Sequence, residues 1–209
     1  MNSGDHWDRI YSAKPVQLLS WYEPRPEASL RLLDQCGLGV DDPLLDVGAG
    51  ASTWIDCLIE KGFRRIYALD ISAVALDRLR ARLGEQGAKR VSWIVGDVTQ
   101  PDWLGPLSGI ALWHDRALLH FLTREEDRQA YRSALLKAVR PGGYVILAAF
   151  SLQGAKQCSG LDVHNYDQDL LAEFLGDGFA LKEWFDELYT MPSGDLRPYI
   201  YTLFQRRPA

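Results

Sequence analysis

Residues 43–52, Pro-Leu-Leu-Asp-Val-Gly-Ala-Gly-Ala-Ser, decide the fold class of this chain. The apolar run at 43–47 predicts a short buried strand, and the glycines that follow let the backbone turn tightly and approach a ligand closely. Ser52 is a suitable N-cap for a helix that ends at Gly62. The apolar face of that helix consists of Trp54, Ile55, Leu58 and Ile59. This order of strand, glycine turn and helix predicts the first unit of an α/β domain.

The rest of the chain repeats the alternation of apolar runs and helical segments. Further strands are predicted at 64–70, 91–95, 109–113 and 144–150. Helix N-caps are predicted at Ser72 and Asp167. A capping box at Thr123–Glu126 begins a further helix, which runs to Val139 and is stopped by Pro141-Gly142-Gly143. The pattern therefore predicts a doubly wound, mainly parallel sheet with helices on both faces.

The two ends of the chain depart from this alternation. Segments 180–190 and 198–204 are both of β type, and their link is too short for a helical crossover, so they predict an antiparallel hairpin. Residues 1–25 are rich in aromatic side chains without a clean period, and Pro26 begins a short helix. We expect one domain over 1–209, with a flap at 1–25 lying over one edge of a core at 26–209.

Composition excludes several classes of protein. A net charge of −5 argues against a general nucleic-acid binder, which needs basic residues to neutralise phosphates. No apolar stretch approaches the length of a membrane span, and the N-terminus lacks the apolar region of a signal peptide. Three widely spaced cysteines fit neither a disulfide framework nor a metal site. We therefore expect a cytoplasmic protein without a metal.

Ligand-type side chains follow three successive predicted strands. Asp46 ends the first strand beside the glycine turn, Asp70 ends the second, and Asp97 with Val98 follows the third. Ligands of open α/β sheets bind outside the carboxyl ends of the strands, where a carboxylate can accept both hydroxyls of a ribose. A nicotinamide dinucleotide is the rival ligand. Asp46 disfavours it, because a carboxylate beside the turn repels a pyrophosphate and attracts a cationic sulfonium.

The motifs LLDVGAGAS, YALDIS, VGDV and RPGG, spread over about residues 26–206, resemble those of class I S-adenosylmethionine-dependent methyltransferases. The resemblance implies a Rossmann-like sheet of seven strands with a reversed last strand. It implies S-adenosylmethionine as cofactor, with S-adenosylhomocysteine as its product. The cofactor contacts we expect are Asp46, Gly48, Ala49, Gly50, Ser52, Asp70, Ile71, Asp97, Val98 and Trp113, with Tyr11 and Trp21 from the flap.

The acceptor side is less defined. His114 and His120 are candidate general bases, although each can equally be a structural histidine. We expect Asp115 and Arg116 to form an internal ion pair. Phe150 and Cys158 belong to a long loop after the fifth strand and are candidate substrate contacts, as His120 is, with a plain buried thiol as the alternative for the cysteine.

The flap supplies the last candidates. Trp21 and Tyr22 either close over a cationic group by cation–π attraction or form a hydrophobic strap, and Tyr22 joins His114 as a candidate catalytic contact. HWDRIY and SWYEP in this region resemble the start of a methyltransferase subgroup that includes small-molecule methyltransferases and relatives of some protein-lysine methyltransferases.

We expect methyl transfer to a small-molecule acceptor, with no nucleic-acid or membrane partner. A protein-lysine methyltransferase and a non-catalytic cofactor-binding subunit are the alternatives.

Overall fold

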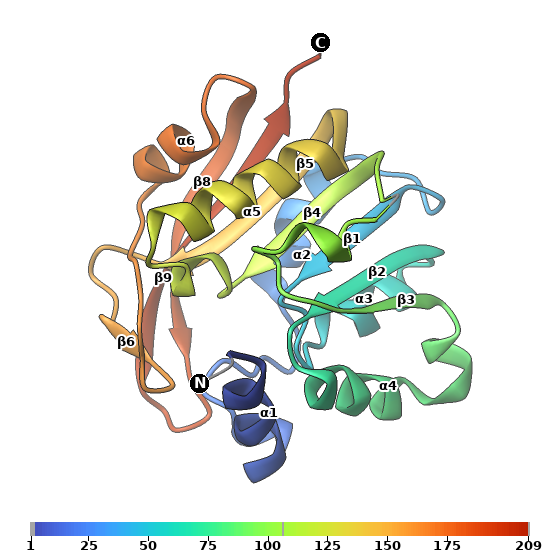
Figure 1. Cartoon of the computed structure of the whole chain (residues 1–209), viewed down its shortest axis with the longest axis vertical. Helices are drawn as coiled ribbons and strands as arrows, with labels where there is room; N and C mark the ends of the chain where they lie inside the picture. The colour runs from blue at the N-terminus through green and yellow to red at the C-terminus, as the bar shows by residue number, and fades with distance from the viewer. Residues whose placement is uncertain (1–2, 106, 209) are drawn as a thin grey trace.

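The computed structural model describes residues 3–105 and 107–208 and contains a seven-stranded sheet (Figure 1). The strand order is β3-β2-β1-β4-β5-β9-β8. The strands are β1 Pro43–Val47, β2 Arg65–Asp70, β3 Val91–Val95, β4 Ile110–Arg116, β5 Val139–Phe150, β8 Phe179–Thr190 and β9 Leu196–Arg206. β1 to β5 are parallel, and β9 runs antiparallel to both β5 and β8, which confirms the predicted mainly parallel sheet and terminal hairpin.

Helices cover both faces of this sheet (Figure 1). On one face lie α2 Glu27–Gln35, α3 Trp54–Glu60 and α4 Ala73–Ala88, and on the other lie α5 Glu125–Ala138 and α6 Gln168–Leu175. Each face has its own apolar core, because alternate residues of a buried strand point to opposite sides. The smaller elements are the 3-10 turns η1 Val16–Leu18, η2 Pro101–Trp103 and η3 Leu119–Phe121, and the strand pair β6 Gln157–Cys158 and β7 Leu161–Asp162.

Of the four predicted helix caps, two are confirmed, one is wrong and one is shifted. The Ser52 hydroxyl accepts the amide of Trp54 at 2.9 Å, but the residue at the N-cap of α3 is Thr53. The Ser72 hydroxyl accepts the amide of Ala75, and the Asp167 carboxylate accepts the amide of Leu170. The capping box at Thr123 does not form. The Thr123 amide is bonded to Phe121 at the end of η3, so α5 begins only at Glu125, without a side-chain cap.

Two of the parallel strands are longer than predicted. β4 continues to Arg116 rather than ending at residue 113, so the polar residues after Trp113 belong to the sheet. β5 begins at Val139 and passes through the Pro-Gly-Gly segment, where its pairing with β4 shifts register. Gly142 takes a φ of +74° there, a conformation that suits glycine and lets the irregular strand continue.

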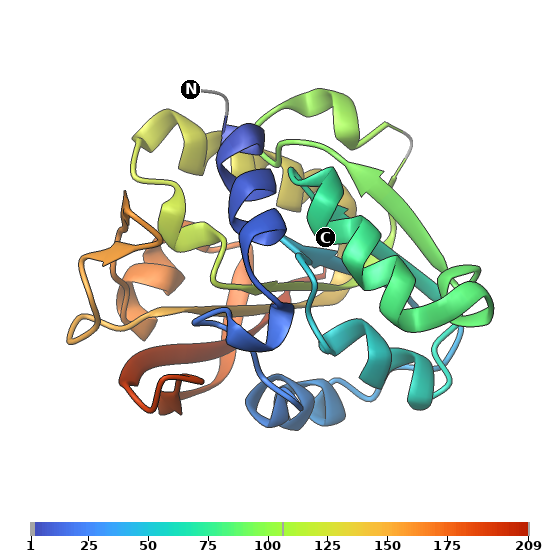
Figure 2. The same ribbon diagram turned by 90° about the horizontal axis from the view of Figure 1, so that it is seen from below.

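The N-terminal segment contains a helix that the aromatic pattern did not indicate. α1 spans Ser3–Ala13 and lies across the edge where the parallel strands end (Figure 2). It is anchored by a 2.5 Å hydrogen bond from the Ser72 hydroxyl to the carboxylate of Asp8, at the start of α4. Trp7 and Tyr11, one helical turn apart, both face this edge. The segment thus covers the carboxyl ends of the strands.

No helix in the described part of the chain is long and apolar enough to cross a membrane.

Candidate functional site

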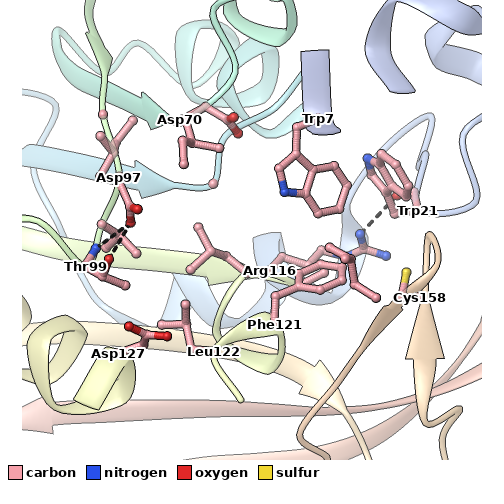
Figure 3. A pocket seen from close by; sticks show the side chains of 18 of the residues that line it. Trp7, Trp21, Asp70, Asp97, Thr99, Arg116, Phe121, Leu122, Asp127 and Cys158 are labelled. Atoms are coloured by element: carbon pink, nitrogen blue, oxygen red, sulfur yellow. Dashed lines mark hydrogen bonds between the residues drawn. The ribbon is translucent and has the colours of Figure 1, made fainter. Parts of the chain in front are cut away.

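A cavity of about 380 Å³ opens at the carboxyl ends of the strands (Figure 3). Its wall combines the loops after β1, β2, β3 and β4 with the N-terminal segment and β9. The lining includes the predicted residues Tyr11, Trp21, Gly48, Asp70, Ile71, Asp97, Val98 and Cys158. The sheet therefore brings together the side chains that follow three separate strands, and the volume lies in the range of roughly 300–1,000 Å³ that is usual for small-molecule sites.

The glycine turn is packed too closely to carry side chains. Gly48 and Gly50 have φ angles of +68° and +54°. A Cβ added at Gly48 would lie 2.6 Å from Leu118 Cδ1, and one at Gly50 would overlap the Tyr11 hydroxyl. Both positions therefore need glycine for conformation and for space, and the backbone of the turn can approach a ligand closely.

Asp70 fastens this turn to the next loop. One carboxylate oxygen accepts the amide of Gly50 and the other accepts the amide of Ser72, both at 2.7 Å. Burial raises the pKa of Asp70 to about 6, although the hydrogen bonds from the two backbone amides act in the opposite direction and lower it. Each carboxylate oxygen has two acceptor sites, so both can accept a further hydrogen bond from a ligand in the cavity.

Asp97 and Val98 form the end of the cavity beyond β3. Asp97 accepts the amide and the hydroxyl of Thr99, which fixes its carboxylate in a tight local turn. Figure 3 shows this pair at one end of the cavity and the two tryptophans, Trp7 and Trp21, at the other. An elongated ligand would thus meet a carboxylate and an apolar side chain first, then Asp70, and finally an aromatic wall.

The aromatic wall is built by residues from distant segments. Trp7 meets Trp21 and Phe121 edge to face, with ring centroids 5.8 and 5.0 Å apart. Beside them, Arg116 bonds Glu23 at 2.9 Å and donates to the Trp21 carbonyl.

A second, smaller cavity of about 50 Å³ adjoins the first and shares part of its wall. Its lining holds the predicted residues Tyr11, Trp21, Tyr22, Asp46, Gly48, Ala49, Ser52 and His114. Asp46 is 3% exposed and bonds His114 through one oxygen, and its other oxygen has no hydrogen-bond partner within the described residues. An unpaired buried carboxylate oxygen beside a glycine turn is suited to a ligand that brings a donor or a positive charge.

Three comparisons with known proteins all find methyltransferases. Residues 44–143 match the family model described as a methyltransferase domain. This segment carries the glycine turn and most of the strand ends that line the cavity, and solved structures with a similar fold include S-adenosylmethionine-dependent methyltransferases.

Among its relatives, a zebrafish (Danio rerio) EEF1A lysine methyltransferase 2 is 24% identical over 87% of this chain and 76% of its own. A methyltransferase structure from Anabaena variabilis superposes with a TM-score of 0.78 at 16% identity, covering 99% and 96% of the two chains. The structure of the N-methyltransferase NodS of Bradyrhizobium japonicum superposes with a TM-score of 0.70 at 16% identity, covering 99% of each chain.

Four predicted contacts, Gly50, Trp113, His120 and Phe150, do not line either cavity. Trp113 is fully buried on the α5 side, where its indole N–H donates to the Tyr131 hydroxyl at 2.8 Å. Phe150 and His120 are buried behind the cavity wall, with ring centroids 4.4 Å apart. Trp113 is not the cofactor contact we expected, because its side chain lies on the face of β4 opposite to that of His114.

The same alternation overturns the expected ion pair between Asp115 and Arg116. Asp115 faces the α5 side, where it accepts the Tyr131 hydroxyl and the amide of Leu118. Arg116 faces the cavity and pairs with Glu23 instead. Adjacent strand residues cannot point to the same side, so the sequence neighbours are kept apart.

His114 lies inside β4 rather than in a loop after it. Its ring stacks on Trp54 at 4.2 Å, Nδ1 bonds Asp46 at 2.6 Å, and Nε2 bonds the hydroxyl of Ser29 at 2.9 Å. Both ring nitrogens are engaged within the protein and the residue is 2% exposed. This geometry argues against a general base and favours a residue that holds Asp46 in place.

Replacing His114 with alanine is therefore expected to cost stability first. The change leaves the Asp46 carboxylate buried without its partner and opens space beside Trp54, so the free energy of unfolding should fall by roughly 3–5 kcal/mol. Urea denaturation followed by tryptophan fluorescence measures this. Full stability with loss of turnover alone would restore His114 as a candidate base.

Several cavity residues had not been singled out in the sequence. Arg116, Phe121 and Tyr199 line the wall although each had been assigned another role or none. Arg116 could have been found from strand alternation once β4 was extended by three residues. No sequence pattern indicated Tyr199 as a cavity residue, because its position at the cavity wall depends on how β9 pairs with β5.

Proposed function

We propose that this chain transfers a methyl group from S-adenosylmethionine to a small-molecule acceptor. The supporting observation is that side chains following β2 and β3 line one cavity beside the glycine turn after β1, which has no room for a Cβ. The donor set also fits the cofactor, since carboxylates meet its hydroxyl groups and its cationic end. When bound, S-adenosylmethionine supplies a methyl group activated by a sulfonium.

In the proposed pose, each part of the cofactor has a matching wall. Asp97 and Val98 bind the adenine, Asp70 accepts the ribose hydroxyls, and the turn at Gly48 approaches the methionine part, which extends toward Asp46. The further contacts that we predicted and that line the two cavities are Ala49, Ser52, Ile71, Tyr11 and Trp21. Gly50 contributes its backbone amide to Asp70, which holds the ribose-binding carboxylate in place.

The N-terminal segment supplies the wall nearest the reacting end. Trp7 and Trp21 exclude water there and present aromatic surfaces that attract a cation, worth roughly 0.5–2 kcal/mol each. Tyr22 lines the smaller cavity, and its carbonyl accepts the Tyr189 hydroxyl at 2.6 Å. We therefore assign Tyr22 to the methionine side. Methyl transfer depends chiefly on alignment, so we assign no general base.

Cofactor affinity is expected to fall below pH 6. The raised pKa of Asp70, about 6, means that its carboxylate is progressively protonated as the pH drops from 7.5 to 5. A neutral carboxyl loses the charge-assisted bonds to the ribose, so the dissociation constant of S-adenosylhomocysteine should rise roughly five- to tenfold. Calorimetry across this range measures the change. The Asp70→Asn variant should bind S-adenosylhomocysteine weakly, with an affinity that hardly changes with pH. If its affinity changes with pH as much as that of the wild type, the pH effect belongs to a group other than Asp70.

A protein-lysine acceptor is the second candidate, favoured by the similarity to the zebrafish lysine methyltransferase. Tritiated S-adenosylmethionine separates the two. The cofactor is incubated with the enzyme and an extract of the source cells, which is then divided into acid-precipitable protein and small molecules. We expect a new tritiated small molecule, separated from the unreacted cofactor by chromatography, which is absent with Asp70→Ala and without added enzyme. Labelling of one protein band would contradict the proposal and support the lysine acceptor; no labelling with intact cofactor binding would support a non-catalytic subunit.

A cytoplasmic setting remains a prediction. It is supported by the three cysteines, which are free and buried.

A further inference from the structure

Three buried nitrogen atoms near the aromatic wall have no hydrogen-bond partner within the described residues. They are Nη2 of Arg116, Nε2 of His120 and Nη1 of Arg197. The residues come from β4, η3 and β9, which are far apart in the sequence. Because an unsatisfied buried polar group costs free energy, a cluster of them requires an explanation.

The three side chains gather around one pair of rings. Phe150 and Tyr199, neighbours across β5 and β9, lie with their centroids 5.0 Å apart. The His120 ring and the Arg197 guanidinium contact Phe150, at 4.4 and 5.2 Å, and the Arg116 guanidinium lies 4.9 Å from the centre of Tyr199. The unpartnered atoms therefore belong to one region of the protein.

All three atoms are hydrogen-bond donors. A guanidinium has no acceptor. The backbone amide of Phe150 donates to Nδ1 of His120, so Nδ1 carries a lone pair and the hydrogen is on Nε2. Burial, with the nearby charges of Arg116 and Arg197, lowers the pKa of His120 to about 3, so this tautomer is neutral at physiological pH. The region thus holds three donors that are left without an acceptor.

The region also carries an excess of positive charge. Arg116 is paired with the carboxylate of Glu23. Arg197 lies over Phe150 and has no carboxylate within ion-pair distance among the residues that the structure describes. The two guanidinium groups therefore have one carboxylate within ion-pair distance, Glu23, in a site where burial weakens screening. The carboxylate of Glu187, opposite Tyr199 on β8, is exposed and lies outside ion-pair distance of both.

This charge lies at the end of the cavity away from Asp97. Arg116, Tyr199 and Cys158 line the wall there, and Figure 3 shows Arg116 and Cys158 on the side of Trp21, opposite Asp97 and Thr99. Only 10% of the Arg116 side chain is exposed. With the adenosine at the Asp97 end, as proposed above, this end is left for the methyl acceptor.

We propose that the methyl acceptor carries an anionic oxygen group, a carboxylate or another oxoanion, which binds to Arg116 and is further stabilised by the positive charge of Arg197. This inference rests on the proposed function and specifies its substrate class. Arg116 is the direct contact. Arg197, which stands behind Phe150, is a specificity-determining residue that acts through its charge. The aromatic side chains of this wall favour an acceptor with a flat apolar body.

Benzoate and its neutral isostere benzamide test the proposal on protein saturated with S-adenosylhomocysteine. By calorimetry at constant ionic strength, benzoate is expected to bind at least roughly tenfold more tightly than benzamide. In Arg197→Gln this preference should fall roughly threefold, with the remainder kept by Arg116, and in the charge-conserving Arg197→Lys it should be unchanged. Absence of benzoate binding, equal binding of both compounds, or an unchanged preference in Arg197→Gln would overturn the inference.

The carboxylate of the cofactor itself is the other anion that Arg116 can bind, and two arms of the experiment separate the sources. S-adenosylhomocysteine carries that carboxylate, whereas methylthioadenosine lacks the amino acid part. If Arg116 binds the acceptor, Arg116→Lys weakens benzoate binding and leaves the affinity ratio of the two nucleosides unchanged. A selective loss of S-adenosylhomocysteine affinity would overturn the inference. Failure of S-adenosylhomocysteine to bind wild-type protein would instead refute the proposed function before benzoate is added.

Discussion

Replacing Gly50 with alanine is expected to reduce S-adenosylhomocysteine affinity by more than tenfold and to destabilise the fold by roughly 1–3 kcal/mol. The added Cβ would overlap the Tyr11 hydroxyl, and the residue would have to keep a φ of +54°. Relief requires the turn or α1 to move, and either movement disturbs the bond from the Gly50 amide to Asp70. Calorimetry gives the affinity, and thermal unfolding gives the stability.

A matched control separates the steric effect from backbone strain. Gly84 has a φ of +66° inside α4, and nothing lies within 4 Å of a Cβ added there. Gly84→Ala should therefore share the conformational cost and leave cofactor affinity unchanged. Combining Gly50→Ala with Tyr11→Phe, which removes the overlapping hydroxyl, should recover part of the affinity. If the Gly50→Ala variant binds S-adenosylhomocysteine as tightly as the wild type, α1 does not pack against the glycine turn as closely as described above.

Replacing Asp70 with alanine is expected to weaken S-adenosylhomocysteine binding by roughly 1.5–3 kcal/mol, about 10- to 150-fold. The substitution removes the carboxylate proposed to accept the ribose hydroxyls, and it leaves the amides of Gly50 and Ser72 without their partner. Some loss of stability should accompany the loss of affinity.

Adenosine and adenine show whether the affinity is lost at the ribose. Adenosine binding should weaken in the Asp70 variant, whereas adenine, which has no hydroxyl groups to offer, should bind wild type and variant alike. Equal weakening of both ligands would mean that Asp70 acts only by holding the turn in shape.

The parts of the fold that depend on local patterning could be predicted from the sequence. The strand, glycine turn and helix at 43–62 follow from an apolar run, two glycines and a capping serine, and the terminal hairpin follows from a link too short to cross over. The aspartates at 70 and 97 were placed correctly because the carboxyl ends of parallel strands meet at one edge.

What could not be predicted depends on tertiary packing. The end of β4 is set by its pairing with β1 and β5, and an error of three residues there put His114 in a loop and paired Arg116 with the wrong carboxylate. The path of α1 was missed because Trp7 and Tyr11 belong to a small separate cluster, with Ala75 of α4 among its members, that forms only when distant segments pack together. Tyr199 reaches the site only through antiparallel pairing with β5.

The central claim is that the cavity at the strand ends binds S-adenosylmethionine, and titration calorimetry of the purified folded protein with S-adenosylhomocysteine tests it most directly. We predict saturable binding of one ligand per chain, weakened in Asp70→Ala and unchanged in Gly84→Ala. No measurable heat of binding across several temperatures, with the protein shown to be folded by its tryptophan fluorescence, would contradict the claim.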